Sequence, residues 1–94
     1  MKKYVYLEKK DGVLIAHHMS ATNRLEVKER TGTCIDNIYS VDLLVKVNNW
    51  LGKRGKTIVF SDKFDVCINY NNGRMHYFKS FAEFRNIVSE YRER

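Results

Sequence analysis

The residues best suited to bind an anionic partner fall in two places in the second half of the chain. The stretch 52–56, GKRGK, places three cations beside glycines, and the segment 69–78 adds an amide, another cation, an imidazole and an aromatic ring. Cationic side chains neutralise phosphates and exposed rings stack on bases, so this mixture is typical of a nucleic-acid surface. We expect a nucleic-acid-binding site formed by Lys53, Arg54, Lys56, Asn69, Arg74, His76 and Phe78.

The distribution of charge favours the same region. The formal net charge of the chain is +6, and residues 53–79 carry six basic groups against two acidic ones. Residues 80–94 carry three of each, and residues 1–52 carry eight basic and six acidic groups. A local excess of this kind attracts an anionic partner. A solvated charged face is the second interpretation, and cations that follow a helix also offset its dipole.

The sequence does not indicate catalysis or metal binding. Its histidines and cysteines show no paired spacing of the CxxC or HxxxH type, and the adjacent His17 and His18 would point to opposite faces of a strand. No glycine-rich phosphate loop, nucleophile elbow or carboxylate pair is present. We therefore expect no enzyme activity, no metal and no cofactor.

The first half of the chain predicts a hairpin and a helix. Two apolar-rich runs over residues 4–19 are separated by Lys10-Asp11-Gly12, a hairpin turn sequence. Residues 23–30 suit either a third strand or a helical turn capped by Thr22, and residues 33–39 suit a short strand. Ser40 as N-cap and Gly52 as terminator predict a central helix between them.

The second half predicts three strands and a closing helix. TIVF, residues 57–60, is a short strand, and Asn71-Asn72-Gly73 is a strong hairpin signal between the next two strands. With Asn72-Gly73 as a two-residue loop, Tyr70 opposes Met75. One face then collects Phe64, Val66, Ile68, Tyr70, Met75 and Tyr77, and the other collects Asp65, Cys67, Asn69, Arg74, His76 and Phe78.

The final helix is predicted by its cap and its apolar stripe. Ser80 and Glu83 have the spacing of a capping box, in which each side chain bonds the backbone amide of the other residue. The stripe consists of Phe81, Phe84, Ile87, Val88 and Tyr91. Such a face must be buried, and the Val66 side of the sheet is the partner we expect.

The second face of that sheet has two possible environments. Exposed, it would present Asn69, Arg74, His76 and Phe78 to bases and phosphates. Covered by the N-terminal hairpin, it would make Phe78 and Cys67 part of the core and His76 a structural histidine.

These features predict an α+β fold and a binding function. We expect one domain over residues 1–94, with an N-terminal hairpin, a central helix, an antiparallel three-stranded sheet and a C-terminal amphipathic helix packed on it. No signal sequence or apolar span is present, so we expect a cytoplasmic protein with no membrane partner and two reduced cysteines. The leading hypothesis is a module that binds nucleic acid or a nucleoprotein. The alternative is a small inhibitor or adaptor that binds a host protein, of the kind encoded by phages and other mobile elements.

Overall fold

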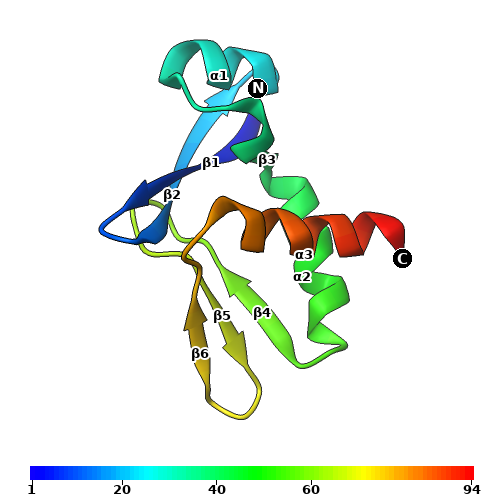
Figure 1. Ribbon diagram of the computed structural model, residues 1–94. Coiled ribbons are helices and arrows are strands. Elements are labelled where there is room, and N and C mark those ends of the chain that lie inside the picture. Colours follow the sequence, from blue (N-terminus) through cyan, green and yellow to red (C-terminus); the bar gives the residue numbers. More distant parts are fainter.

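The chain folds into two three-stranded antiparallel sheets and three α-helices, as the computed structural model of residues 1–94 shows (Figure 1). The α+β class and the predicted order of the main elements are confirmed. The elements are β1 Lys2–Lys10, β2 Val13–Ala21, α1 Arg24–Thr31, the 3-10 turn η1 Ile35–Asn37, β3 Ile38–Ser40, α2 Val41–Gly52, β4 Lys56–Val59, β5 Cys67–Tyr70, β6 Met75–Tyr77 and α3 Phe81–Glu93.

The first sheet is built on the predicted N-terminal hairpin. Its strand order is β2-β1-β3, and β1 and β2 pair from Lys2 with Ala21 to Lys10 with Val13. The turn residues Asp11 and Gly12 both have positive φ, 52° and 82°. Two residues with positive φ match the twist of the flanking strands, so this turn fixes the register of the long hairpin.

The segment after the hairpin, for which two structures were possible, is a helix. The N-cap of α1 is Asn23 and not Thr22, because the Asn23 side chain accepts a hydrogen bond from the Glu26 amide at 2.9 Å. Gly32 ends the helix with φ 76°. Of residues 33–39, which were expected to form a strand, only Ile38 and Tyr39 lie in β3, where they pair with β1.

The central helix α2 begins and ends where the sequence predicted. The Ser40 hydroxyl accepts the Leu43 amide at 3.1 Å, and the helix runs to Gly52. Its half-buried Asn48 donates to the Ile58 carbonyl at 3.0 Å and accepts from the Ile58 amide at 2.8 Å. Because β4 is an edge strand, these bonds satisfy backbone groups that no neighbouring strand pairs.

The second sheet, β4-β5-β6, has a register that differs by one residue from the prediction. Cys67 pairs with Tyr77 and Ile68 with His76, and the Tyr70 amide donates to the Arg74 carbonyl at 2.9 Å. The loop is therefore three residues long, with Gly73 at φ 87°. A shift of one residue turns every side chain of β6 to the other face.

Two consequences follow for the predicted faces. Met75 and Tyr77, expected on the packed face, are exposed at 54% and 44%, and Arg74, His76 and Phe78 share the face of Ile68. Phe64, also expected on the packed face, lies before β5 in a loop and is 68% exposed.

The two sheets are joined at a three-way junction of backbone hydrogen bonds. The Leu14 amide donates to the Phe78 carbonyl at 2.9 Å, the Phe78 amide to the Val66 carbonyl at 3.1 Å, and the Val66 amide to the Leu14 carbonyl at 2.8 Å. All three residues are fully buried. The N-terminal hairpin therefore packs on the base of the β5–β6 hairpin. Phe78 is in the core, as the covered arrangement predicted, but it lies on the face of Ile68, and Asn69 on the other face is exposed.

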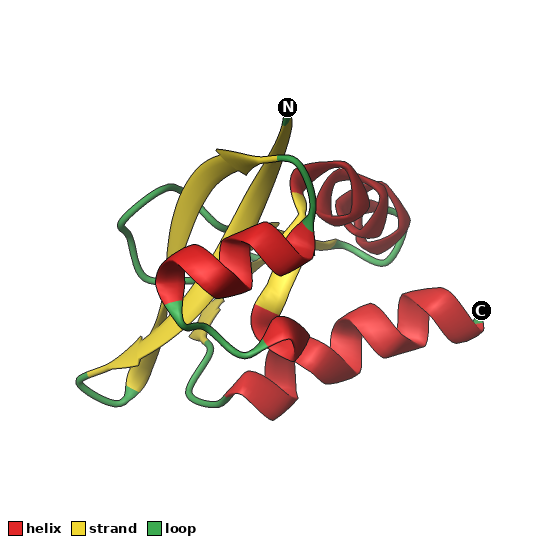
Figure 2. Cartoon of the chain, turned by 90° about the horizontal axis from the view of Figure 1, so that it is seen from above, coloured by secondary structure: helices red, strands yellow, loops and turns green.

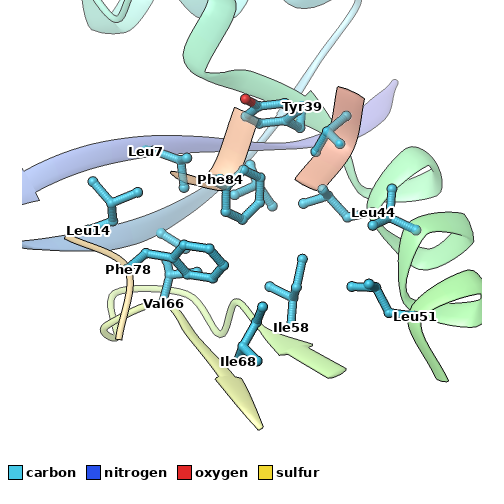
Figure 3. Close-up of a cluster of buried hydrophobic side chains, with 14 residues drawn as sticks. Leu7, Leu14, Tyr39, Leu44, Leu51, Ile58, Val66, Ile68, Phe78 and Phe84 are labelled. Carbon is cyan, nitrogen blue, oxygen red and sulfur yellow. The ribbon is translucent and has the colours of Figure 1, made fainter. Parts of the chain in front are cut away.

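The C-terminal helix α3 closes the core that this junction begins. The Ser80 hydroxyl accepts the Glu83 amide at 3.3 Å, which confirms the Ser80 half of the capping box. Phe84 packs against Phe78 and Tyr39, with ring centroids 5.3 Å and 4.9 Å apart, in a core cluster of 14 buried residues (Figure 3). Viewed from above, α3 runs along one side of the molecule towards the C-terminus (Figure 2). No helix is long and apolar enough to cross a membrane.

Candidate nucleic-acid interface

Two loops lie side by side at the end of the molecule drawn lowest in Figure 1. One joins α2 to β4 and contains Lys53 and Arg54, and the other joins β5 to β6. The Asn71 amide donates to the Gly55 carbonyl at 2.9 Å. Gly55 has φ 76°, a conformation that favours glycine, and a Cβ there would lie 3.3 Å from the Asn71 side-chain nitrogen, which is a tight contact. We call this region, with Lys53, Arg54, Lys56 and Arg74, the basic end.

Aromatic rings accompany the cations at and beside the basic end. Arg54 stacks on Trp50 with its guanidinium carbon 4.3 Å from the ring centroid, and the Lys56 ammonium lies 5.9 Å from the ring centroid of Tyr70. On α3, Arg94 stacks on Tyr91 at 4.2 Å. These are the only three cation–ring contacts in the structure.

The three cation–ring pairs are linked to one another. Trp50 and Tyr91 meet edge to face, with centroids 5.8 Å apart, which joins the end of α3 to the end of α2. The hydrogen bond from Asn71 to Gly55 then connects the α2–β4 loop to Tyr70 and the β5–β6 loop. We call this row of Arg94–Tyr91, Arg54–Trp50 and Lys56–Tyr70 the cation–ring band.

The segments that carry most of the band contain no acidic residue. Residues 43–61 hold Lys46, Lys53, Arg54 and Lys56, and residues 66–82 hold Arg74 and Lys79, with no Asp or Glu in either range. Carboxylates come close in sequence only at the α3 end, as Glu90 and Glu93. The positive potential is therefore least compensated at the basic end, where an anion would be attracted most strongly.

The structure brings four of the seven predicted residues together. Lys56 and Tyr70 are cross-strand partners, and the Tyr70 amide bonds the Arg74 carbonyl, so Lys56, Tyr70 and Arg74 form one row across the sheet. Lys53 and Arg54 lie on the adjacent loop and are exposed. A hollow of about 400 Å³ beside this row is lined by Tyr70, Asn72, Arg74, Met75 and His76.

The other predicted residues differ in position or role. Phe78 is 1% exposed and belongs to the core, so the prediction that it stacks on bases is wrong. Its position two residues beyond His76 places it under the N-terminal hairpin, at the three-way junction. Asn69 is exposed on the opposite face of the sheet from Arg74 and His76, because it pairs with Met75.

His76 is at the surface but has a partner within the chain. Its Nε2 lies 2.9 Å from a carboxylate oxygen of Glu83, in the first turn of α3. Glu83 therefore bonds His76, whereas the capping box predicted a bond to the Ser80 amide. This pair ties the β5–β6 hairpin to α3, so His76 borders the basic end and also has a structural role.

Sequence reasoning missed the aromatic half of the band. Trp50 and Arg54 are four residues apart and Tyr91 and Arg94 three apart, the helical spacings that bring side chains together. Those two pairs could have been found from the sequence. The Lys56–Tyr70 pair could not, because it depends on the register between β4 and β5.

A separate hollow brings together residues of the types used in nucleophilic catalysis. It has a volume of about 710 Å³, and its lining includes His17, Glu8 and Cys34. His17 Nε2 lies 3.0 Å from a Glu8 carboxylate oxygen, but no hydrogen bond joins Cys34 to the histidine. Cys67, the other free thiol, is buried, and burial together with the nearby Asp65 raises its pKa. Neither thiol is paired with a base that could activate it.

Comparison of the chain with protein-family models, with curated proteins and with solved structures finds no match. The cation–ring band is therefore the feature of this chain from which a function can be inferred.

Proposed function

We propose that this protein is a non-enzymatic module that binds nucleic acid, alone or within a nucleoprotein, through the basic end. The observation that carries the proposal is the cation–ring band, three cation–ring pairs that involve the ends of α3 and α2 and the strands β4 and β5. Proteins that bind single strands combine a positive surface that follows the backbone with rings on which bases stack. The band offers both kinds of contact within one row.

The stacked cations remain able to bind phosphate. A guanidinium that lies flat on a ring uses its face for that contact, and its N–H donors point outward in its own plane. Arg54 has no hydrogen-bond or salt-bridge partner within the chain, and neither do the side chains of Lys53, Lys56 or Arg74. These four cations lie in the two ranges without a carboxylate, residues 43–61 and 66–82, which supports phosphate binding.

A salt titration with matched variants tests the proposal. Replacing Lys53, Arg54 and Lys56 together by Ala should flatten the slope of log affinity against log salt by about two to three on a duplex or a single strand. The control replaces Lys9, Lys10 and Lys28, three exposed lysines on the hairpin and α1, and changes the net charge equally. It should leave the slope close to that of the parent.

Two outcomes would refute nucleic-acid binding at the basic end. One is a parent protein that does not bind at physiological salt, and the other is an equal loss in the two triple variants, which would mean that only net charge matters. A thermal melt of each variant checks that the fold is retained.

A second candidate function rests on a different surface. Met75 and Tyr77 are exposed on the outer face of β6, an edge strand, and Phe64 is exposed in the loop before β5. Met75 and Tyr77 lie two residues apart on one face of this strand, and neighbouring exposed apolar side chains are typical of protein interfaces. They support the alternative of a small inhibitor or adaptor that binds another protein.

A pull-down separates the two functions. Under the first, nuclease treatment and the Lys53/Arg54/Lys56 triple variant should each abolish capture of partners from a cytoplasmic lysate. Under the second, the same partners should remain after nuclease treatment and be lost with Met75→Asp and Tyr77→Asp. The two free cysteines support a cytoplasmic place of action in either case.

A further inference from the structure

We propose that the hollow between the ends of α2 and α3 holds one unpaired nucleobase, so that the protein prefers single-stranded over duplex nucleic acid. This inference rests on the proposed function and specifies its substrate. The hollow has a volume of about 280 Å³, and its lining residues are Lys46, Asn49, Trp50, Lys53, Tyr91 and Arg94. That volume is just below the range for drug-sized ligands, which suits a single flat ring system.

The hollow presents two rings at a steep angle. The planes of Trp50 and Tyr91 are inclined by 71°, so a base stacked parallel to one ring would meet the other in an edge-to-face arrangement. Both arrangements are favourable for aromatic groups. Arg54, which covers one face of Trp50, does not line the hollow, so the part of Trp50 that faces the hollow is not covered by that guanidinium.

Polar groups at the rim of the hollow are placed to contact the edge of the base and the phosphates on either side of it. The exposed amide of Asn49 can donate to and accept from the edge of a base. Lys46, Lys53 and Arg94 place three cations around the two rings, where the phosphates on either side of the base would lie. From Lys53 the backbone can continue along Arg54 and Lys56 to the basic end.

This arrangement selects unpaired strands. In a duplex the faces of the bases are stacked on one another and only their edges are accessible, so a ring cannot lie against them. A single strand turns a base outward at little cost, and stacking tolerates every base because each has a flat face. Phosphate contacts alone would not make this distinction.

Trp50 reports on its own site because it is the only tryptophan in the chain. We would follow its fluorescence during titration with three probes: an oligothymidylate, a strand of the same length made of abasic nucleotides, and a duplex of that length. The oligothymidylate should quench the emission, and the abasic strand and the duplex should not. The abasic strand should also bind about 5- to 150-fold more weakly, the loss expected for one stacked base.

Binding measurements on variants of residues that line the hollow test the nucleobase site independently of tryptophan fluorescence. Tyr91→Ala should weaken binding of the oligothymidylate by a larger factor than binding of the abasic strand, whereas Tyr91→Phe keeps the ring and should bind like the parent. Because Tyr91 is half-buried against the core, Asn49→Asp provides a second variant at an exposed position. It keeps the shape of the side chain but adds a negative charge beside the strand, and should weaken binding of the oligothymidylate.

The outcomes separate the two proposals. Equal binding of all three probes with no quenching would overturn the base site and leave nucleic-acid binding in place. Failure of every probe to bind would overturn both.

Discussion

The base and the tip of the β5–β6 hairpin differ sharply although they share one face of one sheet. At the base, Val66, Ile68 and Phe78 are buried beneath the N-terminal hairpin and α3 (Figure 3). At the tip, Arg74 and the loop before it are exposed, and Lys56 and Tyr70 in the same row are half-buried. Phe78 and His76 are two residues apart on the same face, yet only His76 reaches the surface. A residue of this strand is available for binding only if it lies beyond the part that the N-terminal hairpin and α3 cover.

Within this single hairpin, we expect residues at the base to determine stability and residues at the tip to determine binding. Substitutions at the base should change the free energy of unfolding, because they alter packing against two other segments of the chain. Substitutions at the tip should change binding and leave the fold almost unaffected, since surface positions away from such contacts contribute little.

The largest expected effect is at the base. Phe78→Ala should lower the free energy of unfolding by about 3–5 kcal/mol, because it leaves a cavity between Leu14, Val66 and Phe84. Met75→Ala, towards the tip, should change it by less than about 0.5 kcal/mol. Urea denaturation of both variants measures the difference. Similar small losses of unfolding free energy in the two variants would show that the base of the hairpin is packed no more tightly than the tip.

A smaller effect is expected where α2 meets the edge of β4. Asn48→Ala should cost about 1–3 kcal/mol, because both the amide and the carbonyl of Ile58 lose a partner in a half-buried position. The exposed neighbour Asn49→Ala is the control and should be nearly neutral. Hydrogen exchange at the Ile58 amide should accelerate in the first variant only. No change there would mean that water replaces the side chain without cost.

The cap of α3 should contribute less again. Ser80→Ala should cost about 1 kcal/mol through loss of the bond to the Glu83 amide. Ser89→Ala, an exposed serine in the interior of the same helix, should not destabilise, since Ala is the better helix former. Denaturant midpoints for this pair would show whether the start of α3 is fixed by its cap or by the packing of Phe84.

The smallest effect at neutral pH concerns Tyr39, which packs on Phe84 and has a buried hydroxyl without a hydrogen-bond partner. Burial raises its pKa, and the nearby Arg85 offsets this only in part. Tyr39→Phe should therefore change stability by less than about 1 kcal/mol near pH 7.

The same shift predicts a difference at alkaline pH. A raised pKa in the folded state means that the contribution of the neutral phenol is complete below the ordinary pKa of 10.0 and is lost as the pH rises through the folded-state value. The parent should thus lose more stability than Tyr39→Phe between neutral pH and pH values above 10.0. Melting temperatures of both proteins across this range test it. Parallel curves would show that Tyr39 does not ionise on unfolding.

Local signals in the sequence predicted much of the fold. The caps at Ser40 and Ser80, the terminator Gly52 and the turn at Asp11-Gly12 act within a few residues, so each could be read from its own neighbourhood. The sequence does not decide between a strand and a helix for residues 24–31, because Leu25 and Val27 alternate with charges as they would in a strand. Asn23 and Gly32 were the better guides to its limits.

The errors came from features that depend on distant partners. The Asn71-Asn72-Gly73 sequence permits a loop of two or three residues, and the register that decides between them depends on packing under Leu14. That one-residue shift moved Phe78 from the candidate site into the core. The cations of the α2–β4 loop could be located from the sequence because charge is visible there, whereas the row that the accompanying rings form with them could be identified only from the positions of α2, α3 and the second sheet.

The closed set of hydrogen bonds among Leu14, Val66 and Phe78 also has a consequence for the order of folding. One member, Leu14, comes from the first fifth of the sequence and the other two from its last third, so the set cannot form until most of the chain is available. The hairpin β1–β2 and the helix α2 can form early from local contacts. The junction must wait for the costly closure of the long loop between Leu14 and the β5–β6 hairpin, which slows folding relative to a helical protein of similar length. During synthesis, Leu14 and Val66 would therefore stay uncovered until Phe78 has left the ribosome.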